Sequence, residues 1–142
     1  MYTALELSRY IIQKCVREQQ PISNLQLQKI LYYIQKEFLQ QRRERAFAEE
    51  IEAWQFGPVV PDVYYSYCGF GSMPLTINYP NEIQLAPVDI AMIDGIVEAK
   101  RVLKPWELVV ETHKDGGAWD VIYENGLGNH HEIPIELIRE VG

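Results

Sequence analysis

The stretch from Ile22 to Gln41 constrains the fold more than any other part of the chain. Its apolar residues recur every three or four positions, so that on a helix they fall within an arc of about 100°. They are Leu27, Ile30, Leu31, Ile34 and Phe38. Lys29, Lys36 and Gln40 lie on the opposite, polar face. Because an apolar stripe must be covered, we expect a central helix over about residues 23–42, with other helices packed around it.

Capping patterns mark the start of two helices. Ser23 is followed three residues later by Gln26, the spacing of a capping box. Thr3 and Glu6 repeat this pattern ahead of a helix over about residues 4–18. Pro21 separates the two helices, and the short link predicts that they are neighbours.

The later elements are shorter. Alternation over residues 49–56 predicts a strand that Gly57 and Pro58 stop, and a short helix follows from Pro58 to Gly69. Residues 69–87 predict an irregular loop, in which short strands near 75–78 and 82–85 could pair with residues 50–56. Helices are expected over about 87–103, 105–114 and 133–141, whereas residues 119–123 fit a helical turn or a strand.

These patterns predict one fold class. The protein should be mainly α, a compact multi-helix bundle around the central helix, with a small β-hairpin or short sheet. Its 142 residues suit a single domain over residues 1–142, large enough to bury a core without a metal or a disulfide. Cys15 and Cys68 match no metal-ligand spacing, which favours free thiols.

The net charge of −7 is unevenly distributed. Residues 1–45 carry eight Lys/Arg and four Asp/Glu, whereas residues 46–142 carry five and sixteen. An acidic chain repels nucleic acid, so no direct nucleic-acid binding is expected. The acidic surplus would suit a basic protein partner, or it serves solubility alone. No signal-peptide pattern and no membrane-length apolar run is present, which predicts a cytoplasmic protein without membrane contact.

The sequence offers only weak catalytic patterns. Glu111, His113 and Asp115 crowd one helix end, and His130 and His131 lie in a later loop. Together they could hold a metal or act as acid and base, so a metal-dependent enzyme using His113 with His130 or His131 is an alternative. However, Glu111 and His113 are two apart on a helix and point in different directions. We therefore expect no enzyme, no cofactor and no metal.

The three tryptophans, Trp54, Trp106 and Trp119, are expected in the core, because each aromatic ring buries a large area. Any of them could instead anchor a partner.

Three segments together resemble the Panacea-domain family of SocA-like antitoxins, which is found in many phage-associated proteins. They are L-Q-L-Q-K-I-L-Y-Y-I-Q (25–35), I-E-A-W-Q-F-G-P-V-V-P-D-V-Y (51–64) and E-T-H-K-D-G-G-A-W (111–119). The resemblance spans roughly residues 3–140. The motif positions, which we interpret first as scaffold, are Leu31, Tyr32, Tyr33, Gln35, Trp54, Gly57, Pro58, Val59, Tyr64, His113 and Trp119.

The resemblance implies a mainly helical fold with a small β element, and neutralisation of a cognate toxin by direct binding. One family member hands its toxin to a cytosolic protease, so a proteolytic adaptor is an alternative. Ala118 stands where the family commonly has proline, and we expect no DNA-binding domain of the kind that is fused to some relatives. As the toxin-binding surface we expect exposed aromatic residues beside the loop, or else arginines. These candidates are Tyr64, Tyr65, Tyr67 and Phe70, with Arg42 and Arg43 as the other choice.

Overall fold

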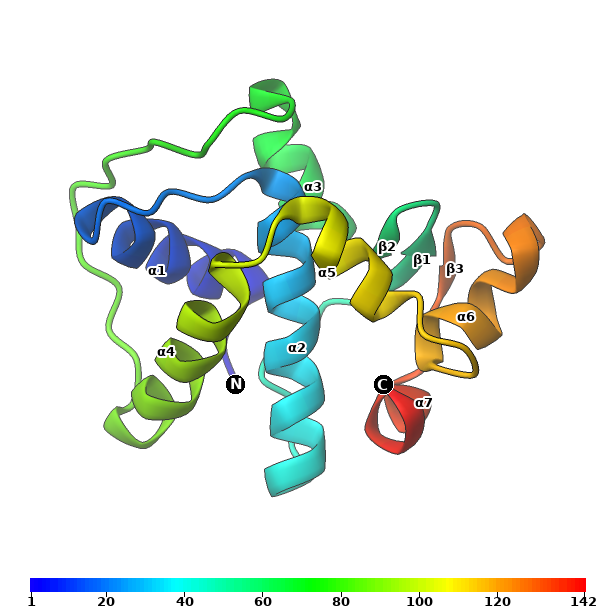
Figure 1. The fold of residues 1–142 in the computed structure, drawn as a ribbon. Helices are drawn as coiled ribbons and strands as arrows, with labels where there is room; N and C mark the ends of the chain where they lie inside the picture. Colours follow the sequence, from blue (N-terminus) through cyan, green and yellow to red (C-terminus); the bar gives the residue numbers. More distant parts are fainter.

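Helix α2 (Asn24–Arg42) runs through the centre of the computed structural model, which describes residues 1–142. It begins with the predicted capping box, in which Ser23 and Gln26 bond each other's backbone N–H groups. Figure 1 shows α2 upright, with α1 and α4 on one side and the sheet, α6 and α7 on the other. Helices α1, α4, α5 and α7 all pack against it, as expected of a central helix.

Helices make up most of the fold, and the mainly α class is confirmed. Their bounds are α1 (Ala4–Arg17), α3 (Pro61–Tyr67), α4 (Pro87–Arg101), α5 (Pro105–Thr112), α6 (Ala118–Tyr123) and α7 (Ile135–Val141). Two 3₁₀ turns, η1 (Cys68–Phe70) and η2 (Glu124–Gly126), follow α3 and α6. Residues 119–123, left open between helix and strand, lie within α6. None of the helices combines the length and apolar character that crossing a membrane requires.

A three-stranded antiparallel sheet in the order β2-β1-β3 is the β element. Strand β1 (Glu52–Trp54) turns through two residues into β2 (Gly57–Val59), and β3 (His131–Glu132) joins from the far end of the chain. The prediction that Gly57 and Pro58 stop the strand is therefore wrong. Pro58 is tolerated because β2 is an edge strand, where a proline leaves no ladder bond unmade in the sheet interior.

The strands predicted near residues 75–78 and 82–85 are also wrong. This segment has no regular secondary structure, and its backbone is bonded instead to α1 and to the link between α1 and α2. The N–H of Leu75 donates to the carbonyl of Ile22 at 2.8 Å, and the amide of Gln13 bonds the backbone of Asn81 and Ile83. These contacts leave β1 free to pair with β3.

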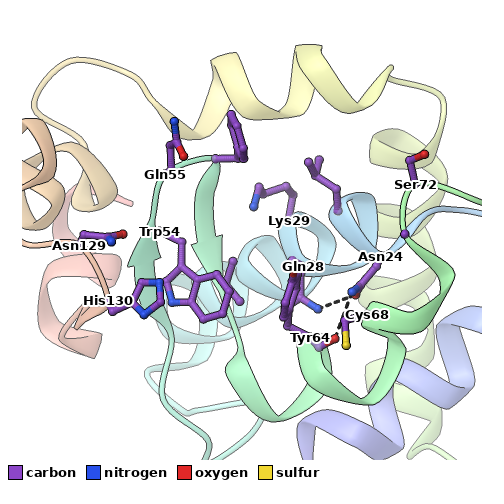
Figure 2. Close-up of a pocket in the computed structure, with 14 residues that line it drawn as sticks. Asn24, Gln28, Lys29, Trp54, Gln55, Tyr64, Cys68, Ser72, Asn129 and His130 are labelled. Carbon is purple, nitrogen blue, oxygen red and sulfur yellow. Dashed lines mark hydrogen bonds between the residues drawn. The ribbon is translucent and has the colours of Figure 1, made fainter.

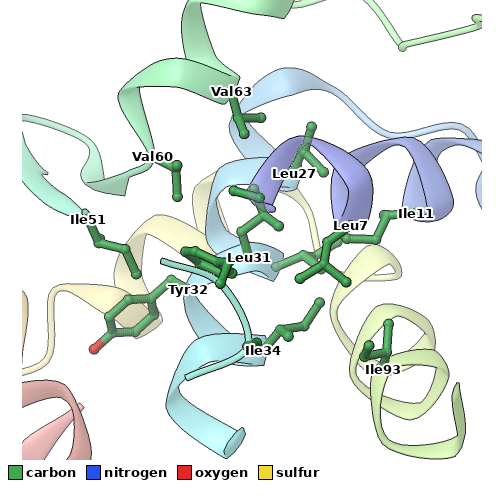
Figure 3. Close-up of a cluster of buried hydrophobic side chains, with 14 of the residues drawn as sticks. Leu7, Ile11, Leu27, Leu31, Tyr32, Ile34, Ile51, Val60, Val63 and Ile93 are labelled. Atoms are coloured by element: carbon green, nitrogen blue, oxygen red, sulfur yellow. The ribbon is translucent and has the colours of Figure 1, made fainter. Parts of the chain in front are cut away.

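A cluster of 28 buried residues forms the core around α2. Figure 3 shows Leu31 and Ile34 of α2 meeting Leu7 and Ile11 of α1 and Ile93 of α4. On α4 the buried positions are Asp89, Ile93 and Val97.

Of the three tryptophans, only Trp119 is fully in the core, at 6% exposed. Trp54 is half-buried, and Trp106 is 67% exposed, so the core prediction for Trp106 is wrong. Trp106 lies four residues before Val110, which is 58% exposed, so both project from the outer face of α5.

Polar side chains buried on α2 hold the following chain segment by its backbone. Gln35 accepts from the N–H of Ala46 at 2.7 Å and donates to the carbonyl of Phe47 at 2.9 Å. Gln28 accepts from the N–H of Val60 at 2.9 Å. A buried backbone group without a partner would cost about 1–3 kcal/mol, so these amides fix where residues 46–60 cross α2.

Lys29 is the strongest departure from the predicted helix faces. Instead of lying on a polar outer face, its side chain is 1% exposed, and its amine donates to the carbonyl of Pro58 at 2.9 Å. No carboxylate lies close enough to pair with it. Burial lowers the pKa of Lys29 from 10.5 to about 7. Strand β2 packs across α2 at this point, and this removes Lys29 from water.

The depressed pKa of Lys29 predicts a stability that rises with pH. Between about pH 7 and 10.5 the unfolded chain binds a proton that the folded chain does not, so unfolding becomes less favourable by up to about 1.4 kcal/mol per pH unit. Lys29→Met removes this term. Urea titrations between pH 7.5 and 9.5 should therefore give a flatter profile for the variant, and parallel profiles would contradict a neutral buried lysine.

Gly57 is predicted to be irreplaceable because of its backbone conformation and its close neighbours. Its φ is +112°, and an added Cβ would lie 2.8 Å from both Lys29 Cε and Thr112 Oγ1. Gly57→Ala should destabilise the fold by about 2–4 kcal/mol, measured by urea denaturation. Gly95→Ala is the matched control, since its Cβ would meet nothing within 4 Å. That exposed position in α4 should gain up to about 1 kcal/mol.

Candidate partner-binding site

An aromatic cluster lies on the outward face of the sheet. Alternation along β1 turns Ala53 into the core and Trp54 outward. The ring of His130 stacks on Trp54 with centroids 4.3 Å apart, because the N–H of His130 donates to the carbonyl of Ala53 at 2.7 Å and places the two rings side by side. Tyr64 meets Trp54 edge-on at 4.9 Å, and Tyr65 lies 6.0 Å away.

A hollow of about 430 Å³ opens beside this cluster, between α2, the β1–β2 turn, α3 and the loop before β3. We call it the hairpin groove (Figure 2). Its apolar and aromatic walls include Leu25, Trp54, Phe56, Tyr64 and His130. Among its lining residues there is no carboxylate, although the chain carries a net charge of −7. The groove therefore combines apolar and aromatic contact with a few polar side chains, among them Lys29, Cys68 and His130.

The walls of the groove are fixed by hydrogen bonds before any partner arrives. Asn24 donates to the carbonyl of Tyr64 at 3.1 Å and accepts from Gln28 at 2.9 Å, the bond drawn in Figure 2. Gln28 in turn holds the N–H of Val60. Both amides are buried, so α3 and the hairpin are tied to the first turns of α2. Such a site loses little conformational entropy on binding.

Acidic side chains border the aromatic cluster. Glu52 and Glu132 are register partners on β1 and β3, which places like charges directly opposite each other. Glu50 and Asp62 are exposed nearby, where they line a small acidic hollow together with Glu52. None of these four carboxylates forms an ion pair within the chain, so the border of the cluster carries an uncompensated negative charge.

Two of the predicted partner-binding tyrosines lie at this site, and Tyr67 does not. Tyr65 is 62% exposed and Tyr64 is half-buried, both against Trp54. Tyr67 is 3% exposed, and its hydroxyl bonds that of Tyr79 at 2.6 Å, so the expectation that it is exposed is wrong. It lies four residues after Val63, on the inward face of α3. Phe70 packs half-buried against the core.

Arg42 and Arg43 lie at the other end of α2, about 25 Å along its axis from the groove. Arg42 ion-pairs with Asp89, donates to the carbonyl of Val88 at 3.0 Å and covers the ring of Phe38 at 4.6 Å. Arg43 is exposed and ends the helix in a left-handed conformation. The two predicted surfaces are therefore separate.

The histidines considered as metal ligands do not converge. His113 stacks on Trp119 with centroids 3.6 Å apart, whereas His130 stacks on Trp54. Burial, and then the nearby Lys29, lower the pKa of His113. No group of three or more His, Cys, Asp or Glu side chains is placed to hold a metal, so the proposed set of His113 with His130 or His131 does not form.

Residues from the three recognised motifs meet behind the groove. Trp119 donates from its indole nitrogen to the carbonyl of Trp54 at 2.7 Å, while Lys29 holds Pro58. The ring of His113 also stacks on that of Trp119.

The sequence pattern missed His130 and Phe56 as groove residues. His130 reaches the groove only through the β1–β3 pairing. Phe56 is 53% exposed in the hairpin turn, whereas the alternation predicts it in the strand.

Comparison with known proteins gives two matches. A family described as "Antitoxin SocA-like, Panacea domain" matches residues 27–120, which run from α2 to α6. Antitoxin SocA from Caulobacter vibrioides (strain NA1000 / CB15N) is 30% identical over 152 residues, covering 97% of this chain and 79% of that protein. No solved structure gives a significant match. The chain belongs to the SocA-like antitoxin family that carries the Panacea domain.

Proposed function

We propose that this protein is an antitoxin that neutralises a cognate toxin by binding it directly. The observation that carries the proposal is membership of the SocA-like antitoxin family over nearly the whole chain. The dispersed histidines also favour a binding role over catalysis. A toxin acting inside the cell would be met in the cytoplasm, where we place this protein.

The toxin would dock on the hairpin groove and its aromatic cluster. Large aromatic side chains beside a preformed hollow are typical of binding hot spots. Trp54, Tyr64, Tyr65 and His130 provide such rings, and Phe56 adds a half-exposed ring on the groove wall. Exposed apolar groups in this number are rare on a surface that stays in water.

The partner's surface would be basic. Glu52 and Glu132 face each other without a cation between them, and Lys or Arg side chains of a partner would relieve that repulsion. Complementary charges of this kind mainly raise the association rate. Binding should therefore weaken as salt screens the charges.

Neutralisation is tested by co-expressing the protein with the products of adjacent genes. An antitoxin restores growth against one of them and forms a stable complex with it. If no adjacent product is toxic, or none is rescued or bound, the proposal fails.

Delivery of the toxin to a cytosolic protease is the second candidate. It requires a surface away from the toxin, and Trp106 with Val110 on the outer face of α5 is an exposed apolar pair outside the groove lining. An adaptor shortens the toxin's half-life in cells, whereas a blocking antitoxin leaves it unchanged or longer.

Tyr65→Ala should weaken toxin binding at least tenfold, about 1.4 kcal/mol, because it removes an exposed ring beside Trp54. Calorimetric titration of the purified complex measures the dissociation constant. The melting temperature should not change, since Tyr65 is 62% exposed. Trp106→Ala is the matched control, an equally exposed ring outside the groove. An unchanged dissociation constant for Tyr65→Ala would move the interface elsewhere, with Arg43 as the next residue to replace.

Charge reversal at the acidic border gives an independent prediction. Glu132→Lys should slow association several-fold at low salt and leave dissociation nearly unchanged, because Glu132 is an exposed charge at the edge of the cluster. Surface plasmon resonance at two salt concentrations separates the two rates. Glu136→Lys on α7, also exposed, controls for the change in net charge. Faster association of Glu132→Lys would show that the partner is acidic.

A further inference from the structure

A second hollow, of about 250 Å³, lies between α2, α4 and α5 and shares no lining residue with the hairpin groove. Three lysines line it: Lys36 of α2, Lys100 of α4 and Lys114 after α5. Glu111 is the one acidic side chain among the lining residues. In a chain with a net charge of −7, this is a local excess of positive charge.

The three amines have different partners. Lys100 pairs with Glu111 at 2.9 Å, and Lys114 donates to the carbonyl of Gly142 at 2.7 Å. Lys36 has neither an ion pair nor a hydrogen bond, and its amine lies 5.7 Å from the centre of the Tyr33 ring. The amine of Lys100 lies 4.1 Å from the centre of the same ring. Burial first, and then Lys114 and Lys100, lower the pKa of Lys36. The hollow thus holds an uncompensated cation.

The unpartnered hydroxyl of a buried tyrosine provides a second, independent indication of a ligand. Tyr32 lines the hollow, is 3% exposed and donates no hydrogen bond within the chain. Figure 3 shows its hydroxyl pointing away from the hydrophobic cluster that surrounds its ring. Burial raises the pKa of Tyr32, so the hydroxyl keeps its proton and stays a donor. Because Tyr32 and Lys36 are four residues apart on α2, both groups face the same side.

We propose that this hollow binds a phosphate group. Lys36 would provide the charge, Tyr32 an O–H donor, and Lys114 a second amine that exchanges its carbonyl partner for a phosphate oxygen. Charge-assisted hydrogen bonds of this kind are about twice as strong as neutral ones. The volume suits inorganic phosphate, pyrophosphate or the phosphate end of a nucleotide. Glu111 stays paired with Lys100 and Tyr33, so it does not face the anion unpaired.

Isothermal titration with inorganic phosphate, pyrophosphate and ATP, at constant ionic strength and pH 7.5, tests the proposal. The wild-type protein should bind phosphate saturably at millimolar concentration or tighter. Lys36→Met should weaken binding at least tenfold and Tyr32→Phe several-fold. Tyr32→Phe removes a hydroxyl that bonds nothing in the chain, so it should fold normally. Lys104→Met, an exposed lysine outside the lining, should bind like wild type.

The three ligands distinguish the possible sources of the phosphate. Similar affinities for all three favour a free phosphate, whereas tighter binding of ATP points to a nucleotide. No saturable binding of any of them by the wild-type protein overturns the proposal. Equal binding by wild type and Lys36→Met also overturns it, because the interaction would then be a general salt effect. Neither result bears on toxin neutralisation, which is measured separately.

Discussion

The structure depends on hydrogen bonds from buried polar side chains of α2 to the backbone of the segment that follows it. A helix covered on most sides would ordinarily carry only apolar residues, because a polar group without a partner is costly to bury. Here Gln28, Lys29 and Gln35 each find a backbone group of residues 46–60. The apolar stripe makes α2 central, and these polar contacts determine where the hairpin and α3 cross it.

The hairpin groove follows from that arrangement. Its floor is the first half of α2, and its walls are segments whose backbones α2 holds. Trp119 fixes the other side by donating to the carbonyl of Trp54, so the ring that carries His130 is anchored from behind. The residues in the family's motifs thus act largely by forming hydrogen bonds to backbone groups. The side chains proposed to touch a toxin, such as Tyr65, lie in front of them.

Sequence patterns predicted the helices well because each rests on local information. The capping box at Ser23 and the prolines at the first position of α3, α4 and α5 fix helix starts without help from the rest of the chain. The strands were harder, since β3 is two residues long and pairs with residues about eighty positions earlier. No periodicity exists in so short a segment.

The site was predictable only in part, for the same reason. Tyr64 and Tyr65 could be named from a motif, whereas the contribution of His130 requires knowledge of the β1–β3 register. Lys29 and Tyr67 were misplaced because a helical wheel records spacing and not which neighbours arrive later. From the sequence alone, a lysine that a later strand covers cannot be distinguished from a lysine that stays in water.

The late position of β3 has a consequence for synthesis. A nascent chain that ends before His130 has the hairpin and α3, but it lacks both the third strand and the ring that covers Trp54. Pairing between such distant residues is slow to form and waits until the ribosome has translated residues 131–132. Products that terminate before this point therefore lack part of the proposed toxin-binding surface. Only chains translated past Glu132 can form the aromatic cluster that we propose binds a toxin.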